Sequence, residues 1–236
     1  MRALFAAMWL ARLLPARALA ALGDALGALA FGLIGERRSV TRINLAKCFP
    51  WMAAAEREGL ARAHFGAWSR SFLDHALLWW SPREHIERLV RIDGREHLRA
   101  LGGAPAILFV PHFVGLDAGF ARLACEIDMV SMYAQQKNPL LGARLLAGRT
   151  RFGRQKLFSR QDGVRALLGA MREGHPLYYL PDMDYGPRGA MFVPFFGVSA
   201  ATMPGLSRIA RVSGAKILPC VTRMLPRGEG YVVSIE

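Results

Sequence analysis

A short apolar run places the strongest limit on how this chain can fold. Residues Ala106–Val110 read Ala-Ile-Leu-Phe-Val and lie between Pro105 and Pro111. Five residues are too few for an ordinary helix, and the prolines close the run at both ends. The pattern therefore predicts a strand that is buried on both faces, with apolar side chains on each. A strand of this kind belongs in a sheet that helices cover on both sides.

The segments around this run alternate in the same rhythm. An amphipathic helix is expected over 53–80, ending at Ser81-Pro82. Beyond it, expected strands alternate with segments of helical pattern, three of which end at glycines. The expected strands are 90–94, 106–110, 129–133, 176–180, 216–221 and 231–235, and the expected helices are 96–101, 116–125, 140–149, 163–173 and 203–213. The sequence thus predicts an α/β fold with a largely parallel central sheet flanked by helices.

The N-terminal segment is apolar enough to meet a membrane. From Ala3 to Gly35 the chain is rich in Ala, Leu and Phe, although Arg12, Pro15 and Asp24 interrupt the run. A cleaved signal peptide and a buried first helix of the core are the alternatives. Because the apolar pattern continues past any cleavage point and a basic flank follows, we predict a retained anchor over 1–35 that spans the membrane or lies in its interface.

Composition narrows the function. The chain has 236 residues, of which 53% are hydrophobic, and its formal net charge is +13. This combination excludes a disordered chain, and three widely spaced cysteines exclude a disulfide-built module. The partners that such a charge leaves open are nucleic acid, an anionic membrane, a phosphorylated lipid and an acidic protein.

The residues after the buried strand carry the candidate chemistry. His112 follows Pro111 directly, and Asp117 stands five positions later where a helix begins. Ligands of open α/β sheets bind beyond the carboxyl ends of the strands, which is where His112 is expected. A turn at Gly115 allows the carboxylate of Asp117 to reach the His112 ring and leave its other nitrogen as a general base. The alternative is a packed histidine beside an acidic residue at a helix N-terminus.

Four sequence blocks in order give these residues a family context. H-x-x-x-x-D after a buried strand resembles the glycerolipid acyltransferase superfamily, and the blocks downstream resemble the bacterial lipid A biosynthesis (late) acyltransferases. Those blocks are Lys137-Asn138-Pro139 with Arg149-Thr150-Arg151-Phe152-Gly153, then Pro181-Asp182-Met183-Asp184-Tyr185-Gly186, then Met191–Gly197 with Ala200-Ala201-Thr202, and then Arg208–Pro219. Many members have Glu at the position of Asp117, and an Arg-Pro often stands where this chain has Gln135-Gln136.

The resemblance implies transfer of a fatty acyl chain from acyl-carrier protein to a hydroxyl of a lipid A precursor, at the cytoplasmic face of the bacterial inner membrane. It assigns His112 as the general base and Asp117 as its orienting partner. The substrate-binding residues that it implies are Lys137, Asn138, Arg149, Arg151, Asp182 and Asp184. No metal or organic cofactor is expected, because the thioester is already activated. Residues 36–236 would form the acyltransferase domain, with a C-terminal piece of the family missing.

A basic segment adds support from charge alone. Nine basic residues and one acidic residue lie between Lys137 and Arg172. An acidic carrier protein, a phosphorylated lipid acceptor and an anionic leaflet would all be drawn to it. No nucleic-acid partner is expected, because the segment lacks the interleaved aromatic residues that bind bases.

Other functions and other residues fit less well. A lysophospholipid or a phosphatidylinositol mannoside is the alternative acceptor, and a basic membrane or nucleic-acid-binding protein without activity is the alternative from another class. We expect His64 and His75 to be core or interface residues of the helix at 53–80. Trp79 and Trp80 are expected to pack in the core. Phe192, Phe195 and Phe196 are expected to pack beneath the loop that carries Asp182 and Asp184.

Overall fold

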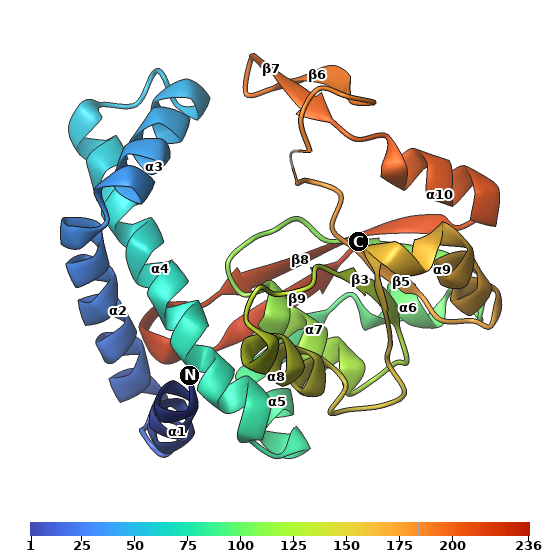
Figure 1. The fold of residues 1–236 in the computed structure, drawn as a ribbon, viewed down its shortest axis with the longest axis horizontal. Helices are drawn as coiled ribbons and strands as arrows, with labels where there is room; N and C mark the ends of the chain where they lie inside the picture. The colour runs from blue at the N-terminus through green and yellow to red at the C-terminus, as the bar shows by residue number, and fades with distance from the viewer. Residues whose placement is uncertain (184) are drawn as a thin grey trace.

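The protein is built around one large, largely parallel sheet (Figure 1). The computed structural model describes residues 1–183 and 185–236, apart from the side chain of Arg160. Within these residues seven strands pair in the order β1-β9-β8-β2-β5-β3-β4, and every pair except β8–β9 is parallel. The strands are β1 (Val90–Asp93), β2 (Ala106–Phe109), β3 (Val130–Tyr133), β4 (Lys156–Ser159), β5 (Leu177–Tyr179), β8 (Lys216–Met224) and β9 (Tyr231–Ile235). The expected fold class is confirmed.

Strand β2 lies near the middle of the sheet and is buried on both faces, as its apolar run predicts. Its Ile107 packs with side chains of α9 (Gly163–Arg172) and α10 (Gly205–Ser213). Its neighbour Leu108 points the other way, into the larger cluster formed with α4 (Ala54–Trp80) and α7 (Leu116–Ala124). The helices α5 (Arg83–Leu89), α6 (Arg95–Arg99) and α8 (Pro139–Arg149) complete the body.

The N-terminal residues form a helical arm beside the body (Figure 1). It consists of α1 (Arg2–Ala11), α2 (Ala16–Leu33) and α3 (Gly35–Cys48), which pack along the long helix α4. Arg70 of α4 forms an ion pair with Asp24 of α2 at 3.1 Å. Among the described residues, α2 is the one helix long and apolar enough to cross a membrane. The anchor over 1–35 and its boundary at 36 stay predictions.

Two differences from the sequence expectations matter for the site. The segment Lys156–Ser159 forms an edge strand, β4, although its mixed composition gives no clear strand signal. The block at 191–202 forms a separate antiparallel hairpin of β6 (Met191–Phe195) and β7 (Val198–Thr202). Its phenylalanines do not pack beneath the Asp182 loop as expected, because the hairpin extends away from the sheet and leaves Phe192, Phe195 and Phe196 exposed. Trp79, by contrast, is buried in the core as expected.

The turn between β2 and α7 depends on a glycine. Gly115 has φ 100° and caps the N-terminus of α7. A Cβ at this position would stand 2.7 Å from the ring of Tyr231, so a side chain would be strained and would also clash. Because Gly115 separates His112 from Asp117, this turn decides where each of the two side chains points.

The close approach of α2 and α4 generates a stability prediction. A Cβ on Gly27 of α2 would lie 2.5 Å from the Cα of Gly66 on α4. Gly27→Ala is therefore expected to push the helices apart and lower the free energy of unfolding by about 1–3 kcal/mol. Gly32→Ala is the matched control, since nothing lies within 4 Å of a Cβ there. It should leave stability unchanged or raise it by up to about 1 kcal/mol. Urea unfolding of both variants in detergent measures the difference, and equal stability would contradict the close packing.

Candidate active site

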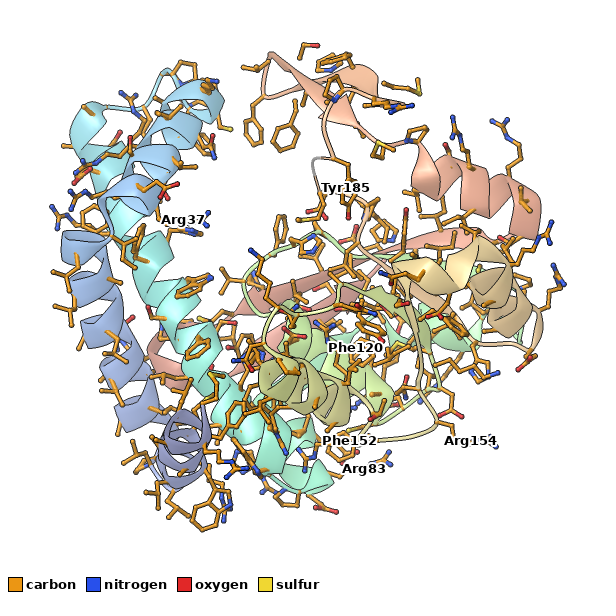
Figure 2. All side chains as sticks on the ribbon, in the orientation of Figure 1. Arg37, Arg83, Phe120, Phe152, Arg154 and Tyr185 are labelled. Atoms are coloured by element: carbon orange, nitrogen blue, oxygen red, sulfur yellow. The ribbon has the colours of Figure 1, made fainter. Side chains whose placement is uncertain are left out.

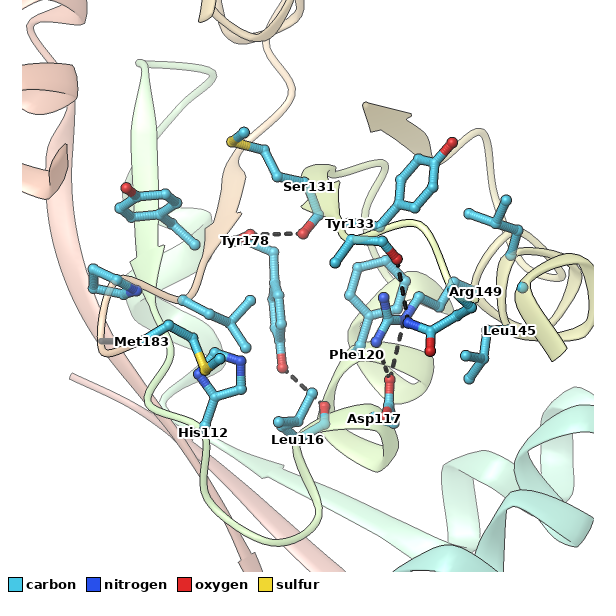
Figure 3. Close-up of a pocket in the computed structure, with 18 of the residues that line it drawn as sticks. His112, Leu116, Asp117, Phe120, Ser131, Tyr133, Leu145, Arg149, Tyr178 and Met183 are labelled. Carbon is cyan, nitrogen blue, oxygen red and sulfur yellow. Dashed lines mark hydrogen bonds and ion pairs between the residues drawn. The ribbon is translucent and has the colours of Figure 1, made fainter. Parts of the chain in front are cut away.

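A cavity of about 580 Å³ opens beyond the carboxyl ends of β2, β3 and β5, between α7 and α8. This is the edge at which His112 was expected, and the residue lines the cavity (Figure 3). Apolar side chains make up much of the wall. The lining residues include Leu116, Phe120, Met132, Leu145, Leu146, Leu180, Met183 and Met203, with the polar groups His112, Asp117, Ser131, Tyr133, Arg149 and Tyr178.

His112 is held by a carboxylate from the neighbouring strand. Its ring Nδ1 lies 2.6 Å from Oδ1 of Asp182, and its backbone N–H donates to Oδ2 of the same residue at 2.7 Å. Asp182 follows β5, which pairs directly with β2, so the loops after two adjacent parallel strands bring the pair together. Since a carboxylate accepts hydrogen bonds, it fixes the proton on Nδ1 and leaves Nε2 with a free lone pair. Within the part of the chain that the structure describes, Nε2 has no hydrogen-bond partner.

Asp117 does not orient His112, which corrects the sequence expectation. Its Oδ1 accepts two hydrogen bonds from Arg149 of α8, from Nη2 at 2.8 Å and from Nε at 3.1 Å. Its Oδ2 lies 3.4 Å from Nε2 of His75 on α4. The turn at Gly115 sends the two side chains to different sides of Tyr178, whose hydroxyl donates to the carbonyl of Leu116 at 2.9 Å (Figure 3). The spacing of five residues therefore does not produce contact.

Asp117, Arg149 and His75 form a partly buried charge cluster between α7, α8 and α4. Burial by itself would raise the pKa of Asp117, but the charges of Arg149 and His75 outweigh it and hold this pKa far below its usual value. The negative charge of Asp117 in turn raises the pKa of Arg149. The cluster therefore contains an ionised carboxylate and an ionised guanidinium at the wall of the cavity.

The geometry of His75 favours its protonated form. Its Nδ1 lies 3.0 Å from the carbonyl oxygen of Ser71, and its Nε2 faces the carboxylate of Asp117. Both partners are acceptors, so only the imidazolium can donate to both. Burial lowers the pKa of His75, but the hydrogen bond and charge of Asp117 raise it more, and the net change is upward. His75 was expected only as a core or interface residue, and no local spacing connects it with residues 117 and 149.

The remaining residues expected in the site lie elsewhere or have other partners. Asn138 caps α8, where its side-chain oxygen accepts from the backbone N–H groups of Leu140 and Leu141. Lys137, beside it, is exposed. Arg151 donates to the carbonyls of Leu78 and Ser81 and so secures the end of α4 rather than the cavity. Asp184 lies outside the described residues.

The basic segment around α8 is partly neutralised within the fold. Lys156 pairs with Glu173, and Arg154 pairs with Asp128. Arg144 donates to the carbonyl of Trp79 and lies 4.3 Å from the ring centroid of Trp80. Several of the nine basic side chains are therefore used to hold elements together, and fewer are available to an anionic partner than the sequence suggests.

The chain resembles known proteins along almost its whole length. Residues 2–236 match the family model for bacterial lipid A biosynthesis acyltransferase. The chain is 34% identical over 227 residues to the lipid A biosynthesis lauroyltransferase of Escherichia coli (strain K12), which is 95% of this chain and 74% of that protein. The palmitoleoyltransferase and the myristoyltransferase of lipid A biosynthesis from the same organism are 29% and 33% identical, covering 89% and 85% of this chain and 69% and 62% of theirs.

The charge cluster predicts how stability depends on pH. Folding lowers the pKa of Asp117, so its contribution to the stability of the fold is fully present above the pKa of the unfolded chain, about 3.9. This contribution is lost as the pH falls below that value. Folding raises the pKa of His75, so its contribution to stability is fully present below the pKa of the unfolded chain, about 6.5. This contribution is lost as the pH rises through the pKa of the folded protein. The cluster should therefore stabilise the fold most between about pH 4 and pH 6.5.

His75→Gln tests this pH dependence. The glutamine still donates a hydrogen bond to Asp117 but has no proton to lose. The fall in stability above about pH 6.5 should therefore become smaller, while the fall in stability below about pH 4 should remain. Urea midpoints of the wild type and the variant, measured in the same detergent across this range, give the comparison. An unchanged alkaline slope in the variant would show that His75 does not titrate in the folded protein as expected.

Proposed function

The chain belongs to the bacterial lipid A biosynthesis acyltransferase family, and we propose that it transfers a fatty acyl chain from acyl-carrier protein to a hydroxyl of a lipid A precursor. The reaction would take place at the cytoplasmic face of the bacterial inner membrane. The relatives named for lauroyl, palmitoleoyl and myristoyl transfer support a fatty acyl group as the transferred unit. The apolar helix α2 is compatible with a place at a membrane.

The observation that carries the proposal is the His112–Asp182 pair at the mouth of an apolar cavity. An imidazole with one nitrogen held by a carboxylate and the other available is the arrangement that accepts a proton from a hydroxyl. The expected partner Asp117 is replaced in this role by Asp182, which the sequence blocks had placed among the substrate-binding residues. Both side chains are about one third exposed, so a substrate has access to the pair.

In the proposed reaction, Nε2 of His112 removes the proton from the acceptor hydroxyl while that oxygen attacks the carbonyl carbon of the acyl thioester. A carbon–oxygen bond forms and the carbonyl electron pair moves to its oxygen. The tetrahedral intermediate then collapses and breaks the carbon–sulfur bond. The imidazolium of His112 returns the proton to the leaving sulfur, which gives an ester and a free thiol. Asp182 stabilises the imidazolium between these two transfers, and no acyl-enzyme forms.

Arg149 and the cavity wall account for the rest of the proposal. Arg149 lines the same cavity as His112 and stays cationic, so it lowers the energy of negative charge that develops on the carbonyl oxygen or that the acceptor phosphates bring. Leu116, Leu145 and Leu146 provide an apolar wall for the acyl chain. The thioester supplies the driving force of the reaction, so the proposal includes no metal or organic cofactor.

Substitution of the pair tests the assigned roles. His112→Ala is expected to abolish acyl transfer, and Asp182→Asn to lower kcat by about 10²–10⁴-fold, since the imidazole loses its orienting carboxylate. His97→Ala is the matched control, because His97 is exposed on α6, away from the cavity. Turnover of acyl-carrier protein thioesters by the purified variants, with circular dichroism to confirm folding, gives the answer. Normal turnover by His112→Ala would overturn the mechanism.

The lipid A of cells that lack the protein tests the acceptor. Mass spectrometry is expected to show lipid A that has lost one fatty acyl group, restored by the wild type but not by His112→Ala. Unchanged lipid A with altered phospholipids or glycolipids would instead favour a lysophospholipid or a phosphatidylinositol mannoside as acceptor. Unchanged lipids of all three classes would support the alternative of a basic binding protein without activity.

A further inference from the structure

Two aromatic turns from distant parts of the chain meet at one end of the molecule. The turn between α3 and α4 carries Phe49 and Trp51, and the turn of the β6–β7 hairpin carries Phe195 and Phe196. The ring centroids of Phe49 and Phe196 are 5.2 Å apart, those of Phe49 and Trp51 are 5.8 Å apart, and those of Phe195 and Phe196 are 4.9 Å apart. We call these four residues the aromatic tip. Figure 1 shows the hairpin and the far end of α3 at the same end of the protein.

The aromatic tip is unusually exposed for side chains of its size. Trp51 is 74% exposed and Phe195 is 58% exposed, and Phe192 on β6 is 62% exposed. Exposed apolar residues that occur singly need no explanation, but a contiguous group of large aromatic residues marks a surface that binds something. Phe49 is half-buried against Phe196, and the other three rings of the tip are exposed.

The hairpin turn keeps a phenylalanine where other residues would fit with less strain. Phe195 pairs with Val198, so Phe196 and Gly197 form a two-residue turn, and their φ angles are 50° and 75°. Such turns favour Asn-Gly, because a bulky residue in the left-handed region is strained. The chain therefore holds an exposed aromatic ring at the tip against its own backbone preference, which indicates that the ring has a binding role.

The charge around the aromatic tip is positive. The stretches 42–58 and 185–202, which include the two turns, contain four basic residues and two acidic residues. Arg42 is paired with Glu58, while Lys47 and Arg188 are exposed. Arg37 lies at the other end of α3, away from the tip (Figure 2), and does not contribute to this charge. Exposed Trp and Phe beside Lys and Arg are the composition that binds at the headgroup level of an anionic leaflet.

We propose that the aromatic tip is a membrane contact, separate from the apolar helix α2, which inserts Trp51, Phe195 and Phe196 into the headgroup region of an anionic phospholipid leaflet. The tip protrudes on two turns, a shape that suits insertion between lipid headgroups better than docking of a folded partner. An apolar lining also leads from the hairpin to the candidate active site. Met191 and Val193 of β6 line a second cavity of about 280 Å³, which shares Met203 with the central one.

Fluorescence quenching by brominated lipid tests the proposal without reference to activity. The full chain is reconstituted into phosphatidylglycerol vesicles with brominated acyl chains, and the wild type is compared with Trp51→Phe. The difference between the two isolates Trp51 from the other tryptophans. We expect the fluorescence of Trp51 to be quenched in the anionic vesicles. In brominated phosphatidylcholine vesicles without anionic lipid, we expect no quenching. An unquenched Trp51 in anionic vesicles would overturn the proposal.

The variant Phe195→Asn with Phe196→Asn provides the matched test of the hairpin. Asparagine suits the left-handed position of Phe196, and Phe195 is an exposed residue at the end of β6. This variant is therefore expected to unfold at the same temperature as the wild type or higher, while the quenching of Trp51 falls several-fold. Val212→Asn is the control, because Val212 is 72% exposed on α10 and lies outside the tip. Its quenching should equal that of the wild type.

Two results would refute the role of the hairpin even if α2 holds the protein on vesicles. One is unchanged quenching in the double variant. The other is a Trp51 signal that responds to soluble acyl-carrier protein and not to anionic vesicles, which would assign the tip to a protein partner. Absence of acyl transfer in a protein whose Trp51 is quenched would contradict the proposed function and leave the membrane contact supported.

Discussion

The carboxylate of Asp117 is the constraint on which the rest of the site depends. A carboxylate removed from water must find opposite charge and hydrogen-bond donors, and here Arg149 and His75 provide them. Because the three groups come from α7, α8 and α4, satisfying this one carboxylate fixes the distances among these helices. Two of these helices, α7 and α8, form part of the wall of the central cavity, so the space open to a substrate depends on this interaction.

Two carboxylates near the cavity thus have different surroundings and different uses. Asp182 is partly exposed and holds the ring of His112, which keeps a basic nitrogen at the mouth of the cavity. Asp117 is held by Arg149 and in turn keeps the guanidinium of Arg149 in place beside the cavity. The edge of the sheet beyond the carboxyl ends of its strands therefore combines a proton acceptor on a loop with a fixed charge pair between α7 and α8. This combination is in keeping with acyl transfer in a largely apolar pocket.

The sequence was sufficient for six of the seven strands of the sheet and for the position of His112. The buried run Ala106–Val110 predicts a central parallel strand, and a histidine directly after it must lie at the ligand-binding edge. The partners were not predictable from spacing. Asp182 reaches His112 because β5 pairs with β2, and His75 reaches Asp117 because α4 crosses α7. Both contacts are set by tertiary packing, whereas spacing along the chain informs only about contacts within one helix or turn.

Helix α4 connects the arm to the site over a short stretch of chain. Arg70 pairs with Asp24 of the arm, and His75 pairs with Asp117 of the cavity wall. An inserted residue turns the following part of an α-helix by about 100° relative to the preceding part. One insertion between Arg70 and His75 would thus separate one of these two pairs, whichever end of the helix stayed in place. Between these positions the chain can exchange residues during evolution, but it cannot gain or lose one.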